Sequence, residues 1–187
     1  GVATICGSGV QSRAHLEAIH QQYPGCQFLV HGRNRRGVEA LVDELAGNGV
    51  NVRGEDRLAD AIASSDVIVT ATNSASPVLT EEHFTGIDGR PRLIVAAGAY
   101  RPDMAELSAN LVRSATPPIV VDTIEGALSE AGDLLQVQPL SDLEIVDLAS
   151  VEQRTAPREK VTIFKSVGNA LWDLAACRVC CRKTATS

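Results

Sequence analysis

The chain has 187 residues, of which 44% are hydrophobic and only 3% aromatic, and its formal net charge at pH 7 is −6. This length holds one core of ordinary size, or one domain with an appendage, and the aliphatic composition favours an α/β interior over a β-sandwich. The negative charge excludes a general basic surface for nucleic acid or anionic lipid, and no apolar run is long enough to cross a bilayer. We therefore expect a cytoplasmic protein that has neither nucleic acid nor a membrane as partner.

The start of the chain predicts a strand, a glycine turn and a helix. The apolar run 2–6 leads into Gly7 and Gly9, and helix-forming residues follow. Such a turn lets backbone N–H groups at a helix N-terminus approach a pyrophosphate, because one glycine bends the chain and another removes a clashing Cβ. Ser12 replaces the third glycine of the usual pattern, so a tight turn without a ligand is the alternative. A second apolar run, 27–31, follows at the spacing of a βαβ unit and favours nucleotide binding.

The rest of the chain predicts strands that alternate with helices. Further strands are expected at 50–53, 66–72, 93–96, 119–122 and 161–164. Helices are expected at 37–46, 58–63, 104–115, 123–128, 143–150 and 168–182, with a polar loop at 150–160. Short strands separated by helices indicate a parallel sheet that is covered on both faces and wound right-handedly. The predicted fold class is α/β, a doubly wound Rossmann-like parallel sheet with a C-terminal helix.

Two regions are expected within the chain. Residues 1–167 are predicted to form an NAD(P)-binding Rossmann domain, and residues 168–187 a terminal helix with an apolar stripe. This stripe either packs on the chain's own sheet or docks elsewhere. Residue 1 is Gly rather than Met and stands at the start of a strand, which suggests that a preceding segment has been removed.

The five cysteines predict free thiols rather than a metal site. Cys6 and Cys26 lie in or beside predicted strands, where small apolar side chains belong. Cys177, Cys180 and Cys181 lie on the predicted terminal helix, and no second Cys/His pair completes a tetrahedral set. No metal is therefore predicted.

The segment after the second strand predicts the cofactor. An NAD site has a carboxylate here for the ribose hydroxyls, whereas an NADP site has an arginine for the 2′-phosphate. The segment 32–36 is basic, and no Asp or Glu lies within 18–38. We predict a preference for NADP(H), with NAD(H) still possible, in which Arg33 contacts adenine and phosphate and Arg35 or Arg36 adds a second charge. A solvated basic turn is the alternative.

Polar residues follow three later strands. Thr72 and Asn73 end one strand, Tyr100 follows the next, and Ser166 and Val167 follow the last. Because the carboxyl ends of parallel strands meet at one crevice, these residues are candidates for contacts with the cofactor or a substrate, although ordinary turns have similar compositions.

A serine hydrolase is disfavoured. His15 and His20 fall on a predicted helix and His83 in a loop, so none forms an acid–base constellation. The glycines beside Ser8 do not have the spacing of a nucleophile elbow.

Five segments together are similar to the cofactor-binding part of the ornithine cyclodeaminase and mu-crystallin family. They are residues 7–13, 66–72, 98–107, 121–122 and 161–170, and the resemblance covers nearly all of the chain. The last segment is the most specific, because a Rossmann domain alone does not need it.

The resemblance implies an architecture and a partner. Members have an N-terminal domain that binds the substrate and forms a homodimer, then the Rossmann domain, then a terminal helix that returns to the first domain. The substrate is a small amino or imino acid, whose carboxylate is held by basic residues of the N-terminal domain.

Two chemistries occur in the family. Ornithine cyclodeaminases convert ornithine to proline and ammonia with NAD, and relatives reduce cyclic ketimines such as pyrroline-2-carboxylate with NAD(P)H. Cyclodeaminases carry an aspartate two residues before the proline of the Gly98 loop, and this chain has Tyr100 there. We therefore expect a ketimine reductase that uses NADPH. The alternatives are an ornithine cyclodeaminase and a non-catalytic NADPH-binding module.

The resemblance also assigns residues to parts of the site. It implies pyrophosphate contacts from Gly7, Gly9, Val10 and Gln11. It implies contacts to the adenosine ribose and its phosphate from Gly32, Arg33 and Asn34. Thr72 and Asn73 would lie along the cofactor, and Ser166 and Val167 near the nicotinamide. Tyr100 is the candidate proton donor, since an imine is reduced more easily once it is protonated.

Overall fold

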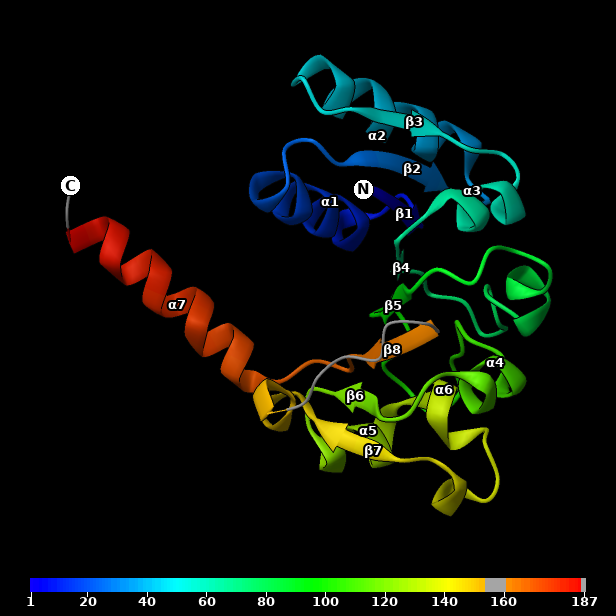
Figure 1. Cartoon of the computed structure of the whole chain (residues 1–187). Helices are drawn as coiled ribbons and strands as arrows, with labels where there is room; N and C mark the ends of the chain where they lie inside the picture. The colour runs from blue at the N-terminus through cyan, green and yellow to red at the C-terminus, as the bar shows by residue number, and fades with distance from the viewer. Residues whose placement is uncertain (154–160, 186–187) are drawn as a thin grey trace.

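The computed structural model describes residues 1–153 and 161–185, which form a twisted sheet with helices on both faces (Figure 1). The strands are β1 (Val2–Cys6), β2 (Gln27–His31), β3 (Val52–Gly54), β4 (Val67–Thr70), β5 (Arg92–Ala96), β6 (Ile119–Val121), β7 (Ile145–Asp147) and β8 (Val161–Lys165). The α-helices are α1 (Val10–Gln22), α2 (Arg35–Gly47), α3 (Leu58–Ser64), α4 (Ala109–Ser114), α5 (Ile124–Glu130), α6 (Gly132–Leu135) and α7 (Ala170–Ala185). Short 3₁₀-helices are η1 (Glu81–Phe84), η2 (Leu140–Asp142) and η3 (Leu148–Gln153).

The strand order places the end of β1 at the centre of the sheet. The order is β3-β2-β1-β4-β5-β8-β6-β7, and all neighbouring strands are parallel. The chain builds outward from β1 to β3 and then crosses to β4 on the other side of β1. Cys6 at the end of β1 pairs with His31 of β2 and Thr70 of β4. Ligands of open α/β sheets bind at this kind of reversal, beyond the carboxyl ends of the strands.

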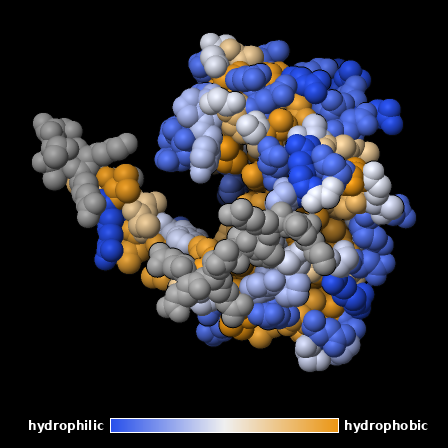
Figure 2. Space-filling model, in the orientation of Figure 1, coloured by the Kyte–Doolittle hydropathy of each residue, from blue (hydrophilic) through white to orange (hydrophobic). Residues whose placement is uncertain are grey.

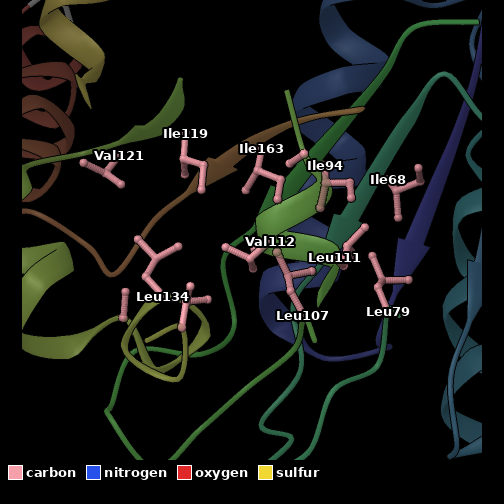
Figure 3. Packing of buried hydrophobic residues seen from close by; sticks show 14 of the residues in the cluster. Ile68, Leu79, Ile94, Leu107, Leu111, Val112, Ile119, Val121, Leu134 and Ile163 are labelled. Carbon is pink, nitrogen blue, oxygen red and sulfur yellow. The ribbon is translucent and has the colours of Figure 1, made fainter. Parts of the chain in front are cut away.

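One face of the sheet carries the larger apolar core. Figure 3 shows a row of strand side chains, from Ile68 of β4 through Ile94, Ile163 and Ile119 to Val121 of β6. Covering side chains pack against this row: Leu79, Leu107, Leu111, Val112 and Leu134. Most of these side chains are fully buried, and each contributes about 1.5–3 kcal/mol by its removal from water.

The opposite face is covered over only part of its width. Leu16 of α1 and Leu41 of α2 pack with Ile5 and Phe28 in a second core cluster. Beyond α1 the described residues leave Leu93 of β5 38% exposed, although β5 is a central strand. An apolar cleft of 830 Å³ lies beside it, between α1 and the strands β4 and β5.

The terminal helix does not pack on the sheet. α7 extends away from the body of the molecule, and hydrophobic residues lie on its surface (Figures 1 and 2). The exposed fractions of its apolar side chains range from 48% to 63%: Leu171, Trp172, Leu174 and Val179. Of the two alternatives for the apolar stripe, packing on the chain's own sheet is therefore not the one observed.

The predicted fold class is confirmed, but two predicted helices are not. Only residues 109–114 of the predicted helix 104–115 are helical, because the backbone before them forms hydrogen bonds with distant residues. The N–H groups of Glu106 and Leu107 donate to the Asp133 carboxylate at 2.6 and 2.8 Å, and helix α4 starts after its cap Ser108. The predicted helix 143–150 is wrong, since residues 145–147 form β7 beside β6 and η3 follows.

Two further differences from the predicted elements lie in the second half of the chain. Helix α6 was not expected, because its four residues are too few to give a periodic pattern. The predicted loop 150–160 begins inside η3, and its residues 154–160 lie outside the described part of the chain. Within the described residues, no helix is both long enough and apolar enough to span a membrane.

Candidate functional site

A cleft of 710 Å³ lies where β1, β2 and β4 end. Its walls come from the turn after β1, the turn after β2 and the segment after β4. The lining includes seven of the residues that the sequence assigned to a cofactor: Gly7, Gly9, Gly32, Arg33, Asn34, Thr72 and Asn73. These residues are far apart in the chain, and the parallel sheet brings them to one edge.

Gly7 is required by the turn itself. Its φ of 122° lies in the region that side-chain-bearing residues rarely adopt, and its N–H donates to the His31 carbonyl at 2.8 Å. A Cβ at this position would lie 2.7 Å from the Ala71 carbonyl oxygen and 2.8 Å from Ser12 Oγ. Ser12, at the place of the usual third glycine, is fully buried beneath this turn. Gly7 is therefore needed for the conformation of the turn itself.

Gly9 has a different environment. It caps α1 at φ −89°, and a Cβ there would have no atom within 4 Å. No side chain caps the helix and its first turn holds no acidic residue, so the first N–H groups of α1 have no side-chain acceptor among the described residues. A helix N-terminus in this state attracts phosphate oxygens through its N–H groups and its dipole. The residues here fit the pyrophosphate of a dinucleotide.

The end of the cleft beside the turn after β2 is basic. Arg33 lines it, and no lining residue is a carboxylate. Among the described residues Arg33 has neither a hydrogen bond nor an ion pair, so its guanidinium is available to a ligand. Asn34, the next residue, instead caps α2, because its side-chain oxygen accepts from Gly37 N at 3.2 Å.

Arg35 does not lie in this cleft. Its guanidinium pairs with Glu39 at 3.2 Å and Asp56 at 3.5 Å, and it lines a separate groove between α2 and β3. Arg36 has no hydrogen bond or ion pair among the residues described, but it does not line the cleft either. Arg33 is thus the arginine of the basic segment that the fold brings to the site.

A second cleft, of 640 Å³, adjoins the same edge of the sheet beyond β5 and β8. Gln11, Tyr100, Ser166 and Val167 line it. The sequence assigned Ser166 and Val167 to the nicotinamide and Tyr100 to the substrate, but it assigned Gln11 to the pyrophosphate. Val10, the remaining predicted residue, is 83% exposed and lines neither cleft with its side chain. Tyr100 is 54% exposed, and its ring lies 6.0 Å from the Arg101 guanidinium carbon.

His15 was missed by reasoning from the sequence. It lies on α1, one turn after Gln11, and it lines the second cleft together with Tyr100 and Ser166. Burial lowers the pKa of His15, so its imidazole is neutral at neutral pH. The glycine turn and the helical spacing together could have pointed to it, because residues four apart share one face of a helix.

A buried carboxylate joins the walls of the two clefts. Glu106 is completely buried, and it accepts from the backbone N–H of Thr72 at 2.7 Å and of Gly98 at 2.7 Å. It also accepts from the hydroxyls of Thr70 and Thr72 at 2.9 and 2.8 Å and from Ala99 N at 3.3 Å. A Cβ on Gly98 would clash with both Thr72 and Glu106. The loop that leads to Tyr100 is therefore fixed against the end of β4.

The Thr72 hydroxyl is oriented by this arrangement. Its hydroxyl hydrogen is donated to Glu106, and its oxygen accepts from Ser74 N at 3.3 Å. Thr72 also lines the first cleft, and its hydroxyl oxygen can accept a hydrogen bond there but not donate one.

A second buried pair lies behind the loop. Lys165 and Asp133 are both fully buried, and Lys165 Nζ lies 2.9 Å from Asp133 Oδ2. Lys165 also donates to the Ala99 carbonyl at 2.5 Å. Because the other Asp133 oxygen accepts from Glu106 N, the two buried groups form one network that supports the segment 97–107.

The described residues contain no group of three or more His, Cys, Asp or Glu side chains placed to hold a metal ion. Cys6 and Cys26 are buried free thiols, and Cys177 and Cys181 are exposed on α7.

Comparison with known proteins identifies the family. The model of the "Ornithine cyclodeaminase/mu-crystallin family" matches residues 1–186. A Delta(1)-pyrroline-2-carboxylate/Delta(1)-piperideine-2-carboxylate reductase of Azospirillum brasilense is 38% identical over 93% of this chain and 53% of its own length. The ketimine reductase mu-crystallin of Mus musculus is 35% identical over 95% of this chain and 54% of its own.

Comparison with solved structures finds proteins of the same kind. The Thermococcus litoralis Delta(1)-pyrroline-2-carboxylate reductase, solved with NADH and L-proline, superposes with a TM-score of 0.76 at 27% identity, over 89% of this chain and 53% of the other. The chain thus spans about half the length of the curated relatives it matches. On the family match and these identities, the chain belongs to the ornithine cyclodeaminase/mu-crystallin family.

Proposed function

We propose that this chain is the NADP(H)-binding part of a ketimine reductase that reduces a small cyclic imino acid of the pyrroline-2-carboxylate type. The observation that carries the proposal is that two clefts lie at the same edge of the sheet, one on each side of the start of α1. Gly9 lines the first and Gln11, two residues further on, lines the second. A dinucleotide that follows α1 would extend from one cleft into the other.

Each part of the cofactor has matching residues. The N–H groups at the start of α1, with Gly7 and Gly9, suit the pyrophosphate, and Val10 and Gln11 contribute their backbone there. Gly32, Arg33 and Asn34 suit the adenosine ribose, and the unpaired Arg33 suits a 2′-phosphate.

The nicotinamide half of the cofactor would lie between Thr72 and Asn73 on one side and Ser166 and Val167 on the other. When bound, the reduced cofactor supplies a hydride. The protein's own part is to orient the two reactants and to bring a proton to the imine nitrogen.

Tyr100 is the proposed proton donor. Its side chain lines the second cleft, and its phenol carries an O–H that can protonate an imine nitrogen or hold a water that does so. A tyrosine cannot replace the carboxylate that cyclodeaminases have at this position, which favours reduction over the ornithine reaction. If Tyr100→Phe leaves turnover unchanged in an otherwise intact enzyme, this role is excluded.

The exposed stripe of α7 supports a second domain. Four apolar side chains on one projecting helix are 48–63% exposed. A cluster of this kind is typical of a surface that another domain or protein covers. We propose that residues 168–187 dock on a substrate-binding domain through which the protein forms a homodimer. A cytoplasmic location fits the free thiols of Cys6 and Cys26.

The proposal is tested by following NADPH oxidation with Δ1-pyrroline-2-carboxylate, and separately by following the formation of proline and ammonia from ornithine in the presence of NAD, which that reaction regenerates. We expect turnover with the imine and NADPH. Turnover with ornithine alone would establish the cyclodeaminase instead. NADPH binding without turnover on any cyclic imine, in a protein that carries the substrate domain, would establish a non-catalytic module.

A further inference from the structure

Asp122 holds the turn that forms one wall of the second cleft. It stands directly after β6, and Ser166 stands directly after β8, so the pairing of Val121 with Lys165 brings the two residues together. Asp122 is 7% exposed, and its carboxylate accepts from Ser166 Oγ at 2.7 Å and from Gly168 N at 2.9 Å. It also accepts from Val167 N at 3.2 Å.

These contacts fix the direction of one hydrogen. The Asp122 carboxylate is surrounded by two backbone N–H groups and one hydroxyl, so it acts here only as an acceptor. A serine hydroxyl has a single hydrogen, which Ser166 donates to Asp122. The Ser166 oxygen keeps two lone pairs, and one of them accepts a long hydrogen bond of 3.3 Å from Gly168 N. Towards a ligand in the cleft, Ser166 can therefore accept a hydrogen bond but not donate one.

We propose that Asp122 is a positioning residue that fixes the Ser166 hydroxyl as an acceptor, so that the cleft selects a ligand with an N–H donor at this point. The inference rests on the proposed function. Two groups have that chemistry: the carboxamide NH₂ of the nicotinamide, and the protonated ring nitrogen of a cyclic imine or of its amine product.

The first experiment compares donors on the cofactor. Calorimetry measures the Kd of NADPH and of its 3-acetylpyridine analogue, in which a methyl group replaces the carboxamide NH₂. We expect about a 5-fold preference for NADPH, the effect of one hydrogen bond, and its loss in both Ser166→Ala and Asp122→Asn. In Asp122→Asn the amide presents N–H groups of its own, so the Ser166 hydrogen is no longer held in place.

The second experiment compares donors on the substrate. With NADP⁺ present, the Kd of L-proline is compared with that of tetrahydrofuran-2-carboxylate, which has oxygen in place of the ring N–H. If the imine side provides the donor, this preference falls towards 1 in Ser166→Ala and Asp122→Asn, and the preference for NADPH stays constant.

A matched control separates positioning from loss of structure. Asp66 also accepts a backbone hydrogen bond, from Val2 N at 2.8 Å, but it precedes β4 at the opposite edge of the sheet. Asp66→Asn should leave both preferences as they are. A purely structural role of Asp122 would weaken every ligand equally and leave both ratios unchanged in Asp122→Asn, which overturns the inference whatever the ratios in Ser166→Ala. A protein that binds no NADPH at all would instead overturn the proposed function, and this inference with it.

Discussion

The carboxylate of Glu106 accepts both the backbone N–H and the hydroxyl of Thr72, at 2.7 and 2.8 Å, although the two residues are 34 positions apart. The same carboxylate accepts the N–H of Gly98, so one buried side chain holds the ends of two adjacent strands. This contact ties Thr72, which lines the first cleft, to the loop that leads to Tyr100 in the second cleft.

Replacement of Glu106 should therefore be costly. In Glu106→Gln, an amide NH₂ takes the place of an oxygen that accepts at least two hydrogen bonds, and those buried donors lose their partner. We expect the free energy of unfolding to fall by about 3 kcal/mol, measured by urea denaturation. Glu44→Gln is the control, because Glu44 forms an exposed ion pair with Arg13, and its denaturation midpoint should stay unchanged. Equal midpoints for the two variants would contradict the structural role of Glu106.

The pair of Lys165 and Asp133 should behave as one unit. Lys165→Met leaves the Asp133 carboxylate buried without its cation, and we expect a loss of about 4 kcal/mol. Adding Asp133→Asn removes the unpaired charge and keeps an oxygen for Glu106 N, so the double variant should be more stable than the single one. A double variant that is no more stable than Lys165→Met would show that the charge is not the cause.

The two glycines of the turn should separate stability from binding. Gly7→Ala forces a Cβ against the Ala71 carbonyl at φ 122°, and we expect a destabilisation of about 1–3 kcal/mol. Gly9→Ser meets no atom within 4 Å and supplies a good helix cap, so stability should not fall, whereas nucleotide binding should be lost. Thermal unfolding and NADPH titration of both variants check this. Full NADPH affinity in Gly9→Ser would mean that phosphate does not approach this turn.

The buried thiol of Cys6 should make stability depend on alkaline pH. Burial, and secondarily the charge of Glu106, raises the pKa of Cys6 from 9.0 to about 12. The folded protein then holds this proton while the unfolded chain releases it, so stability is lost as pH rises above 9 and towards 12. Across this pH range, the free energy of unfolding should fall more steeply for the unmodified protein than for Cys6→Ala. Parallel curves would show that Cys6 does not contribute.

The elements that the sequence predicted well are those determined by local pattern. The strands 2–6 and 27–31 and the helix after Gly9 follow from apolar runs and a glycine turn, and the parallel sheet follows from their alternation. The carboxyl edge then brings Gly7, Arg33 and Thr72 together without further information.

What the sequence did not reveal depends on distant partners. The segment 104–107 has a helical composition, but Asp133 and the chain at 78–79 take its backbone hydrogen bonds. The composition of the short segment 145–147 does not distinguish a strand from a helix. It forms a strand because it pairs with its neighbour β6. The roles of Asp122 and Glu106 were hidden in the same way, although both lie in the segments that carry the family resemblance.

The most direct test of the cofactor assignment is a calorimetric titration of NADPH and NADH against the unmodified protein and Arg33→Ala, with Arg35→Ala as control. NADPH should bind more tightly than NADH. Arg33→Ala should weaken NADPH by about 10- to 100-fold while NADH changes little, because only NADPH has a phosphate for the unpaired guanidinium. Arg35→Ala should have little effect, since Arg35 is already paired with Glu39 and Asp56. Equal affinities for the two nucleotides, or an equal loss of both in Arg33→Ala, would contradict the assignment of Arg33 to the 2′-phosphate.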